Sequence, residues 1–513
     1  MSPAEAFLAS GAGVGPVERR IDTHAAILFL TRDRAWKLKR PIATGYLDFS
    51  TPDRRRAALE AELELNQRTA PELYLAVHPV TRRADGTLGL GGPGEPVDWV
   101  LEMRRFPDGA LLSDRLAAGA LAPTLADALA DAVAAFHAKA EPVVGPAADR
   151  FAAIVDGNAR SLEVEGEAFD RPAVHRLIAA QRSALERLRP LLDARGAGGR
   201  VARLHGDLHA ANVAILDGRP VLFDALEFSA ELATVDRLYD LAFLLMDLWR
   251  RAEPQGACRI LNRWFDRLGE DEAALALLPL FLSVRATVRA HVAATRARVT
   301  GEAAARARAQ ADLAWAEAFL APVPPVLVAV GGLSGTGKSA LALGLAAELG
   351  RPPGARVLRS DVVRKRQWGR LLEERLPPEA YTPDASARVY AELDHRAGQA
   401  LAAGQAAVLD AVHASAAERR QAEARARQAG VAFAGLWLDA PLAVRLARVR
   451  TRVGDASDAD EAVARAQEAM APADPSPFRP LDASGPLDAT RALARAILSA
   501  EFGTRPRSQK FGG

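Results

Sequence analysis

Short apolar runs of strand length mark the first hundred residues of the chain. They lie at 25–30, 35–39 and 97–103, and turn-forming residues such as those at 84–87 separate runs of this kind, as in hairpins. The segment that opens at 50–53 with Ser-Thr-Pro-Asp instead carries the start signal of a helix, because a hydroxyl residue before Pro and Asp favours a first helical turn. The pattern therefore predicts a β-rich lobe with one helix.

Helical spacing takes over from about 110 to 320. Residues 125–136, for example, place apolar side chains three to four positions apart. A β-rich island at 201–223 interrupts the helices, and the last helix, at 303–319, runs into the proline-rich segment 321–325. Clustered prolines cannot continue a helix, so this segment is predicted to be a linker between domains.

Strand and helix signals alternate after the linker. Strands are expected at 326–330, 356–359, 406–409 and 432–438, and helices at 338–349, 390–403, 416–429 and 442–452. Apolar strands that alternate with helices predict a parallel sheet covered on both faces.

These patterns predict an α+β domain followed by an α/β domain. The expected organisation is a domain at 1–320 with a small β-rich lobe at about 20–105 and a helical lobe at about 106–320, a linker at 321–325, a second domain at 326–500 and a flexible tail at 501–513.

Composition indicates which kind of protein this is and where in the cell it is expected. A chain of 513 residues is long enough for several domains, and 66 Lys and Arg against 64 Asp and Glu leave a net charge of only +2. That balance argues against a dedicated nucleic-acid binder, which usually carries a basic excess. The first residues lack the segments of a signal peptide, and the longest apolar runs, such as 241–246, are too short to span a bilayer. We expect a cytoplasmic protein without membrane or nucleic-acid partners, and its oligomeric state stays open.

Cys258 is the one cysteine of the sequence. The chain therefore forms no internal disulfide and no cysteine-based zinc site. The simplest interpretation of Cys258 is a small buried hydrophobic side chain.

The clearest chemical motif follows the first strand of the second domain and opens its first helix. The motif is Gly332-Leu333-Ser334-Gly335-Thr336-Gly337-Lys338-Ser339. Its glycines let backbone N–H groups wrap phosphates, Lys338 reaches the β- and γ-phosphates, and Ser339 is placed to ligate magnesium. The motif predicts a P-loop that binds ATP and Mg²⁺.

Two acidic residues follow later strands of the same domain. Asp361 comes directly after the strand at 356–359, and the carboxyl ends of strands face the ligand crevice in open α/β sheets. Asp361 is therefore a candidate to accept a proton from a substrate hydroxyl, and Arg364 to hold an anionic group. Asp410 ends another strand and is a candidate magnesium partner. Each Asp has an alternative role as a helix cap.

Arg448 and Arg452 lie four positions apart on one predicted helix face. Planar, permanently charged arginines suit a lid over a transferring phosphate, although arginines on a solvated helix are equally ordinary. With the P-loop and the Ser-Asp-x-x-Arg element at 360–364, this arrangement resembles the gluconate-kinase and zeta-toxin-like small-molecule kinases. The resemblance implies transfer of a γ-phosphate to a small hydroxyl compound.

The first domain carries a second motif of the same chemistry. The string is His205-Gly206-Asp207-Leu208-His209-Ala210-Ala211-Asn212. An Asp and an Asn on one loop, followed after a short hairpin by Asp224, is the layout of a kinase catalytic loop and its metal-binding Asp. Asp207 would accept the proton of the substrate hydroxyl, and Asn212 and Asp224 would hold magnesium. The alternative is a surface loop with fortuitous acids.

Residues from about 20 to 300 resemble the aminoglycoside phosphotransferase family, which has a kinase-like fold. The resemblance implies that Lys37 steadies the α- and β-phosphates, with Lys39 as the alternative. It implies that Glu62 pairs with this lysine, with Glu60 as the fallback. It also places Met103 at the hinge that carries the adenine.

The resemblance further implies that His209 and Asp240 brace the catalytic loop. Two features depart from a protein kinase: no Gly-rich loop stands at the expected place, and Asp224 and Asp240 are too close for a long activation segment. A small-molecule acceptor is therefore favoured. The acidic run in this region is Asp224, Glu227, Glu231 and Asp236. It favours either a cationic acceptor or an ordinary role in metal support and surface charge.

Two hypotheses about function follow. The first is a bifunctional ATP-dependent phosphotransferase with two nucleotide sites, each acting on hydroxyl groups of sugar-like or amino-sugar-like molecules. The second has one catalytic domain and one nucleotide-sensing or toxin-like module. Aminoglycoside inactivation rests on the family resemblance alone and ranks lower, because fold does not fix substrate.

Overall fold

The computed structural model describes residues 1–23, 25–43, 48–451 and 456–503. The chain divides into two compact units. The first comprises Met1–Asp156 and Arg189–Asp247, and the second Gly157–Leu188 and Leu248–Gly513.

A six-stranded antiparallel sheet forms the N-terminal part of the first unit, in the order β1-β2-β3-β6-β4-β5. Its strands are β1 (Arg19–Asp22), β2 (Ala26–Leu30), β3 (Arg34–Lys39), β4 (Tyr74–Arg82), β5 (Leu88–Leu90) and β6 (Glu95–Arg104). Helix α1 (Pro3–Ala9) buries Leu8 against β2 and β3, and α2 (Pro52–Asn66) buries Leu59 against Tyr74 and β6. Thr51 caps α2 with its side chain and Pro52 follows, so the predicted helix start is confirmed.

The rest of the first unit is mainly helical and carries a small hairpin. Its elements are α3 (Leu112–Ala118), α4 (Pro123–Lys139), β7 (Val201–Arg203), β8 (Val213–Leu216), β9 (Arg219–Leu222), α7 (Ala230–Ala233), β10 (Thr234–Asp236) and α8 (Arg237–Arg250). Helices α5 (Ala147–Val164) and α6 (Arg171–Ala197) contribute residues to both units. The hairpin β8–β9 turns at Asp217 and Gly218, both with positive φ, as a tight turn requires.

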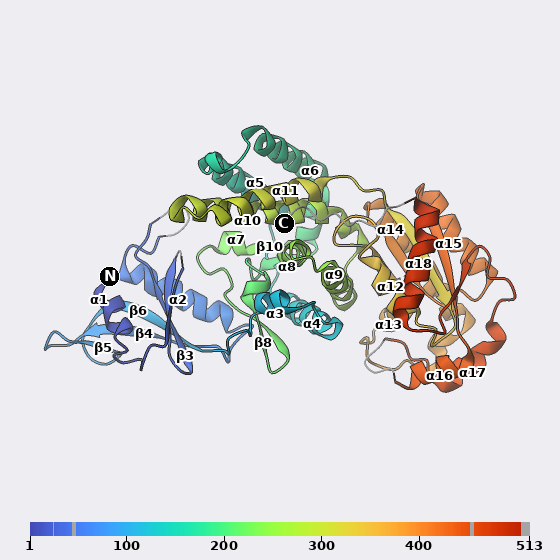
Figure 1. Cartoon of the computed structure of the whole chain (residues 1–513), viewed down its shortest axis with the longest axis horizontal. Coiled ribbons are helices and arrows are strands. Elements are labelled where there is room, and N and C mark those ends of the chain that lie inside the picture. The colour runs from blue at the N-terminus through green and yellow to red at the C-terminus, as the bar shows by residue number, and fades with distance from the viewer. Residues whose placement is uncertain (24, 44–47, 452–455, 504–513) are drawn as a thin grey trace. The chain divides into compact units, whose positions relative to one another are not determined.

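The second unit contains a five-stranded parallel sheet in the order β12-β13-β11-β14-β15. The strands are β11 (Val326–Gly332), β12 (Arg356–Arg359), β13 (Ala407–Asp410), β14 (Ala432–Asp439) and β15 (Arg479–Asp482). The chain moves in one direction along the sheet from β11 to β12 and in the other from β13 to β14. Crossovers of the usual right hand then place the connecting helices on opposite faces. The predicted parallel sheet with helices on both faces is confirmed (Figure 1).

The second unit contains further helices, in addition to parts of α5 and α6. They are α9 (Pro254–Leu268), α10 (Leu278–Thr300), α11 (Ala303–Leu320), α12 (Lys338–Ala346), α13 (Ser360–Gln367), α14 (Pro383–Ala402), α15 (Ala416–Ala429), α16 (Leu442–Arg450), α17 (Glu461–Ala466) and α18 (Leu487–Phe502). Short 3₁₀ turns add η3 (Glu272–Leu277) and η4 (Pro378–Tyr381). Helix α18 extends into the segment predicted as a tail, and residues 504–513 lie outside the described part.

Four elements of the second unit, β15, α13, α17 and α18, are absent from the sequence prediction. Strand β15 contains Pro480 and three exposed positions out of four, which hides its strand character; it lies at the sheet edge, where proline is tolerated. Helix α13 is short and rich in charge, and α18 follows a segment of weak pattern. The predicted boundary at 321–325 stays a prediction about sequence domains and does not coincide with the two compact units.

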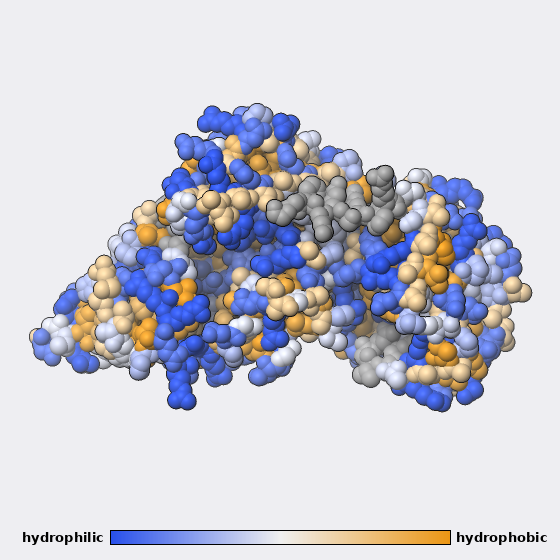
Figure 2. All heavy atoms as spheres, in the orientation of Figure 1, coloured by the Kyte–Doolittle hydropathy of each residue, from blue (hydrophilic) through white to orange (hydrophobic). Residues whose placement is uncertain are grey.

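Cys258 is buried in the apolar core that also contains Val328 and Leu341, as predicted. Burial raises the pKa of its thiol to about 12. Among the described residues, one helical stretch, Glu272–Thr300, is long and apolar enough to cross a membrane, and 72% of its apolar window is buried in the protein. On the face drawn in Figure 2, hydrophilic and hydrophobic residues are interspersed.

Candidate functional sites

The predicted catalytic loop of the first unit follows β7 and is fixed by a buried carboxylate. Asp240 of α8 accepts hydrogen bonds from the backbone N–H of Gly206 (2.8 Å) and of His205 (3.3 Å), and His137 Nε2 lies 3.0 Å from the same carboxylate. Gly206 has φ 77°, and an added Cβ would lie 2.9 Å from Leu226 Cβ. Only glycine fits here without strain. The predicted bracing by Asp240 is confirmed.

Asp207 and Asn212 form a bonded pair on this loop. Asn212 Nδ2 donates to both the backbone oxygen and Oδ2 of Asp207, each at 3.0 Å. His209 Nε2 lies 3.5 Å from Asp207 Oδ2, and the His209 ring meets the Phe243 ring edge to face. These contacts hold the Asp207 carboxylate in place while 38% of its side chain remains exposed to a ligand.

The hairpin β8–β9 brings Asn212 and Asp224 together. Asn212 precedes β8 and Asp224 follows β9, and the Phe223 N–H donates to the Asn212 carbonyl at 3.1 Å. Strand pairing therefore converts a separation in sequence into adjacency in space.

Asp224 has a left-handed backbone, with φ 61°. Non-glycine residues adopt this region at a cost, and such strain often accompanies functional positions. Two groups hold it: the Tyr74 hydroxyl accepts from the Asp224 N–H at 3.0 Å, and Asn66 Oδ1 accepts from the Ala225 N–H at 2.9 Å. Sequence patterns did not single out Tyr74 or Asn66, because a tyrosine in a strand and an asparagine in a helix are unremarkable without their partners.

A chain of alternating charges joins β3, α2 and the segment after β9. Lys37 Nζ lies 2.6 Å from Glu62 Oε1 and 2.8 Å from Asp224 Oδ1. Lys39 Nζ lies 2.6 Å from the other Glu62 oxygen and 2.5 Å from Glu227 Oε1. Lys37 contacts the candidate metal ligand, so the geometry favours Lys37 over Lys39 as the phosphate-side lysine.

Glu62 is also favoured over Glu60. Glu62 is fully buried between the two lysines, whereas Glu60 is exposed and pairs with Arg56 on the same helix.

Charges within this network set the protonation states. Burial alone would lower the pKa of Lys37, but Asp224 and Glu62 outweigh it and hold the pKa well above its usual range. Burial alone would raise the pKa of Asp224, and Lys37 lowers it instead. Burial, with Glu62 nearby, raises the pKa of Glu227 despite its contact with Lys39. Lys37 is therefore a cation and Asp224 an anion at neutral pH.

The oxygen donors of this loop suit magnesium. Both amide hydrogens of Asn212 are engaged by Asp207, which leaves its amide oxygen for a ligand, and the Asp224 side chain is 40% exposed. Within the described residues, no group of three or more His, Cys, Asp or Glu side chains is placed to hold a metal. A set of one or two protein oxygens is typical of Mg²⁺ that arrives bound to phosphates.

Two further sequence expectations concern the surroundings of this site. Met103 lies at the end of β6, opposite Ala35, and packs against the core around Leu101. Three of the four acids in the acidic run are paired internally: Asp224 and Glu227 bind the lysines, and Asp236 forms a buried pair with Arg195 at 2.6 Å. Glu231 is exposed. Internal pairing favours the interpretation as structural charge over attraction of a cationic acceptor.

The P-loop of the second unit connects β11 to α12. Gly335 has φ 87°, and an added Cβ would lie 2.6 Å from the Arg445 carbonyl, so the loop requires glycine at this point. The Thr336 hydroxyl donates to the Leu333 carbonyl at 2.8 Å, and Lys338 Nζ donates to the same carbonyl at 3.1 Å. Lys338 thus lies over the loop whose backbone amides would receive phosphates.

Candidate acidic residues gather beside the P-loop at the ends of β12 and β13. Arg359 and Asp410 are register partners, and Arg359 Nε lies 3.3 Å from Asp410 Oδ2. Arg359 Nη2 also lies 3.3 Å from Ser339 Oγ. Burial raises the pKa of Asp361, with Asp410 adding to the rise and Arg359 and Lys338 opposing it. The structure therefore brings Ser339, Asp361 and Asp410 to one edge.

Neither acid is a helix cap. The N-cap of α13 is Arg359, and Asp361 lies inside the first turn. Asp410 is the last residue of β13, and Ser415 caps the next helix, α15. The alternative of plain helix caps is therefore wrong for both residues.

Arg364 is buried on α13, and its guanidinium already has protein partners. It donates to the Ala380 carbonyl and, at 3.4 Å, to Ser386 Oγ, and it stacks over the Tyr381 ring at 4.9 Å. Its predicted contact with an anionic substrate group stays a prediction.

Arg448 binds the P-loop from α16. Its guanidinium donates to the carbonyls of Thr336 (3.2 Å), Ala483 (2.7 Å) and Gly485 (2.7 Å). These bonds tie the P-loop to the segment after β15, and a lid role for Arg448 stays a prediction. Arg452 lies outside the described residues.

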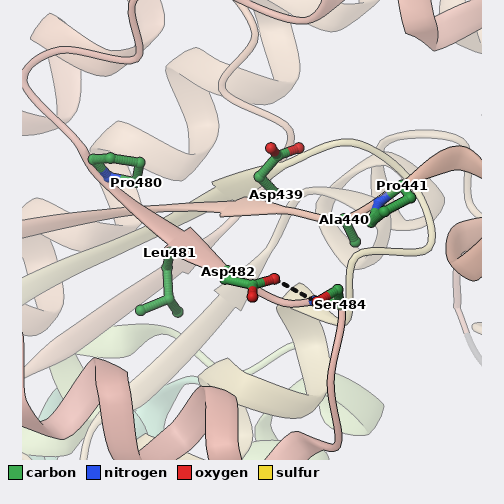
Figure 3. A pocket seen from close by; sticks show the side chains of 7 residues that line it. All are labelled: Asp439, Ala440, Pro441, Pro480, Leu481, Asp482 and Ser484. Atoms are coloured by element: carbon green, nitrogen blue, oxygen red, sulfur yellow. Dashed lines mark hydrogen bonds between the residues drawn. The ribbon is translucent and has the colours of Figure 1, made fainter.

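A hollow of about 360 Å³ lies at the ends of β14 and β15, on the opposite side of β11 from Asp361 (Figure 3). Its lining residues are Asp439, Ala440, Pro441, Pro480, Leu481, Asp482 and Ser484. Asp482 accepts from the Ser484 N–H at 2.8 Å. Two carboxylates, Asp439 and Asp482, line this hollow, so its charge disfavours phosphates.

Comparisons with known proteins match both halves of the chain. Residues 24–278 match the model of the "Phosphotransferase enzyme family", and residues 327–473 match an "AAA domain" model. Uncharacterized proteins of Mycobacterium tuberculosis (strain ATCC 25618 / H37Rv) and Mycobacterium bovis are 32% identical over 478 residues, which covers 91% of this chain and 92% of each relative.

Solved structures match each part at lower identity. A choline/ethanolamine kinase family protein from Mesorhizobium loti is 16% identical, with 62% of this chain and 93% of that chain covered and a TM-score of 0.39. A gluconokinase from Sinorhizobium meliloti 1021 is 20% identical, with 36% of this chain and 100% of that chain covered and a TM-score of 0.26.

The charge chain of the first unit yields a stability prediction. Lys39→Met is expected to lower the unfolding temperature of this unit more than Lys37→Met. Lys39→Met leaves Glu227, with a side chain only 10% exposed, without its cation, whereas water can solvate the 40% exposed Asp224. Removing one partner of a buried pair costs about 3–5 kcal/mol. Differential scanning calorimetry at neutral pH measures the difference.

Arg56→Met is the matched control, because the Arg56–Glu60 pair lies exposed on α2. Exposed pairs contribute about 0–1 kcal/mol, so this variant should unfold close to wild type. An equal or greater fall in unfolding temperature in Lys37→Met would contradict the expectation that Lys39 contributes more than Lys37 to the stability of this unit.

Proposed function

The chain belongs to a family of proteins in which a phosphotransferase-type domain precedes a P-loop kinase-type domain, and from this premise we propose that it is a bifunctional ATP-dependent phosphotransferase. Its two separate nucleotide sites would act on hydroxyl groups of small, sugar-like or amino-sugar-like molecules. The observation that carries the proposal is that each unit brings a lysine, oxygen-bearing side chains and an Asp together, Lys37 with Asn212, Asp224 and Asp207 in the first and Lys338 with Ser339, Asp410 and Asp361 in the second. These groups would serve phosphates, magnesium and a hydroxyl proton, respectively.

In the first unit, Asp207 would accept the proton of the acceptor hydroxyl. The hydroxyl oxygen forms a bond to the γ-phosphorus as the bond from that phosphorus to the β–γ bridging oxygen breaks, and ADP leaves with the electron pair. Lys37, held by Glu62, would bind the α- and β-phosphates. A Mg²⁺ bound by Asn212 and Asp224 would neutralise charge on the phosphates.

In the second unit, the topology separates the tasks along the sheet edge. The P-loop follows the central strand β11, so phosphates would sit in the middle. Asp361 follows β12, so the acceptor hydroxyl would lie on the side of the sheet where β12 and β13 are. Lys338 would reach the β- and γ-phosphates, and Ser339 with Asp410 would hold magnesium.

Small acceptors fit the first site better than protein substrates. Between Asp224 and Asp240 the chain forms only α7 and β10 before α8 begins, so it has no long segment there to hold a peptide. Glu227 and Asp236 are paired with cations of the protein, so they do not select for an amino-bearing acceptor. A neutral hydroxyl compound would fit this site equally well.

The alternative is that one site is catalytic and the other senses nucleotide. Both proposals share the nucleotide sites, so they differ in how many acceptor-dependent activities the protein has.

A pair of variants tests the number of sites. Asp207→Asn and Lys338→Ala are each expected to abolish one phosphoryl-transfer activity, by about 100-fold or more, and to leave the other unchanged, because loss of a general base or a phosphate-binding cation acts locally. Wild type and variants are assayed with ATP and Mg²⁺ over a panel of sugars, amino sugars and aminoglycosides, by ADP release and product mass.

The double variant is the control for background hydrolysis. Loss of all transfer in Lys338→Ala together with full activity in Asp207→Asn would overturn the two-site proposal in favour of the sensing alternative. ADP release that does not depend on any acceptor would overturn both.

The raised pKa of Asp361 gives a pH prediction for the second site. A base acts in its ionised form, so the rate falls as pH falls through its pKa. The acid limb of kcat in the Asp207→Asn protein should therefore lie above about pH 4, the ordinary range of an aspartate. Arg359→Gln should move the limb to still higher pH, because Arg359 opposes the rise. A limb at or below pH 4, or an unmoved limb in Arg359→Gln, would exclude Asp361 as the base.

A further inference from the structure

The segment from α9 to η3 completes the open edge of the parallel sheet. Strand β12 is the edge strand, and Asn262 of α9 pairs with its backbone: Oδ1 accepts from the Val357 N–H at 2.7 Å, and Nδ2 donates to the Ala355 carbonyl at 3.0 Å. One side chain thus satisfies a donor and an acceptor that an adjacent strand would otherwise bind.

A buried ionic cluster fastens the same edge. Arg356 of β12 is 1% exposed; its Nε lies 3.0 Å from Glu272 Oε1 and its Nη2 lies 2.6 Å from Asp266 Oδ1. The second oxygen of Glu272 accepts from Arg396 Nε of α14 at 2.9 Å. Buried ions require complete pairing, so this cluster defines one geometry between the segment and the sheet.

The next helix along the chain is held by α9 as well. Arg366 of α13 donates through Nη2 to the carbonyls of Phe265 (2.6 Å) and Asp266 (2.8 Å), at the C-terminal end of α9. Cations at a helix C-terminus are favoured by its exposed carbonyls. Both β12 and α13 are therefore anchored to α9, and between their anchors lies the turn that carries Asp361.

The anchoring segment lies on the other side of the sequence boundary. Residues 254–277 fall within the phosphotransferase match at 24–278, yet they pack on the sheet of the P-loop part. The P-loop itself follows β11, two strands away from β12. Gln255 of α9 donates to the Gly344 carbonyl, towards the C-terminal end of α12 and away from the P-loop. The contacts with Arg356 and Arg366 thus concern the acceptor half of the site.

We propose that the segment from α9 to η3 is a positioning element of the second phosphotransferase site, with Asn262, Asp266 and Glu272 as its positioning residues. They hold β12 and α13 so that Asp361 and Arg359 face the P-loop. The expected effect on kcat rests on the proposed function of the P-loop site. Its structural part, the order of residues 356–367, does not depend on any acceptor.

Three measurements on the full chain in the Asp207→Asn background test it. Asp266→Asn is the primary variant, because Asp266 is the least buried member of the cluster, and Glu272→Gln is the stronger one. Both should lower kcat at least tenfold with the best acceptor from the panel. Both should bind Mg²⁺ with AMP-PNP, measured by calorimetry, within twofold of the parent. Both should speed hydrogen exchange in the peptide covering 356–367.

Glu373→Gln is the matched control. Glu373 pairs with Arg267 of α9 at the same junction, but its side chain is 45% exposed. This variant should leave kcat, nucleotide binding and exchange at parent values, because it removes an α9 contact outside the buried cluster.

The outcomes separate the two proposals. Unchanged kcat and unchanged exchange in Asp266→Asn and Glu272→Gln overturn the positioning role, as does a loss of AMP-PNP binding equal to the loss of kcat, which indicates general unfolding. If no acceptor supports turnover by the parent, the proposed function fails. The exchange data with bound AMP-PNP then decide the positioning role alone: faster exchange confined to 356–367 supports it, and its absence overturns it.

Discussion

Each compact unit contains a fully buried carboxylate that is bound by two cations. Glu62 takes Lys37 on one oxygen and Lys39 on the other, and Glu272 takes Arg356 and Arg396 in the same manner. An ion in a low-dielectric interior is tolerated only when its partners are complete, so each carboxylate fixes two elements at once. The surrounding geometry follows from that requirement.

In the first unit, the requirement reaches the reacting groups directly. Glu62 orients Lys37, Lys37 contacts Asp224, and Asp224 is adjacent through the hairpin to Asn212 and the catalytic loop. The strained backbone of Asp224 persists because neighbouring elements over-determine it. In the second unit the requirement acts at a distance, through the edge strand and the helix that follows it. The two proposed phosphotransferase sites thus differ in which contacts fix their geometry, although both have an acid at the end of a short strand.

Local motifs explain what the sequence made predictable. The P-loop, the Asp207–Asn212–Asp224 spacing and the strand–helix alternation are signals within short windows, and the structure brings those residues together. Contacts between distant segments cannot be predicted from such motifs, because the residues involved are ordinary in a strand or a helix. Examples are Tyr74 with Asp224, Asn66 with Ala225 and Lys39 with Glu227. Strand β15 was missed because proline and exposed positions obscure it at the sheet edge.

The same limit applies to the α9–η3 segment, with a consequence for domain boundaries. Asn262, Asp266 and Glu272 lie on a helix and a turn where polar residues normally face water, so pattern alone assigns them to a solvated surface. They are instead buried or nearly so, and their partners lie across the proline-rich segment. A boundary drawn from motifs follows the chemistry of each half, whereas a compact unit follows burial. The motif-based domains and the compact units must therefore differ where charged residues of one half are buried by the other. Separating the halves at the linker would expose the Arg356 cluster and the backbone of β12 to water.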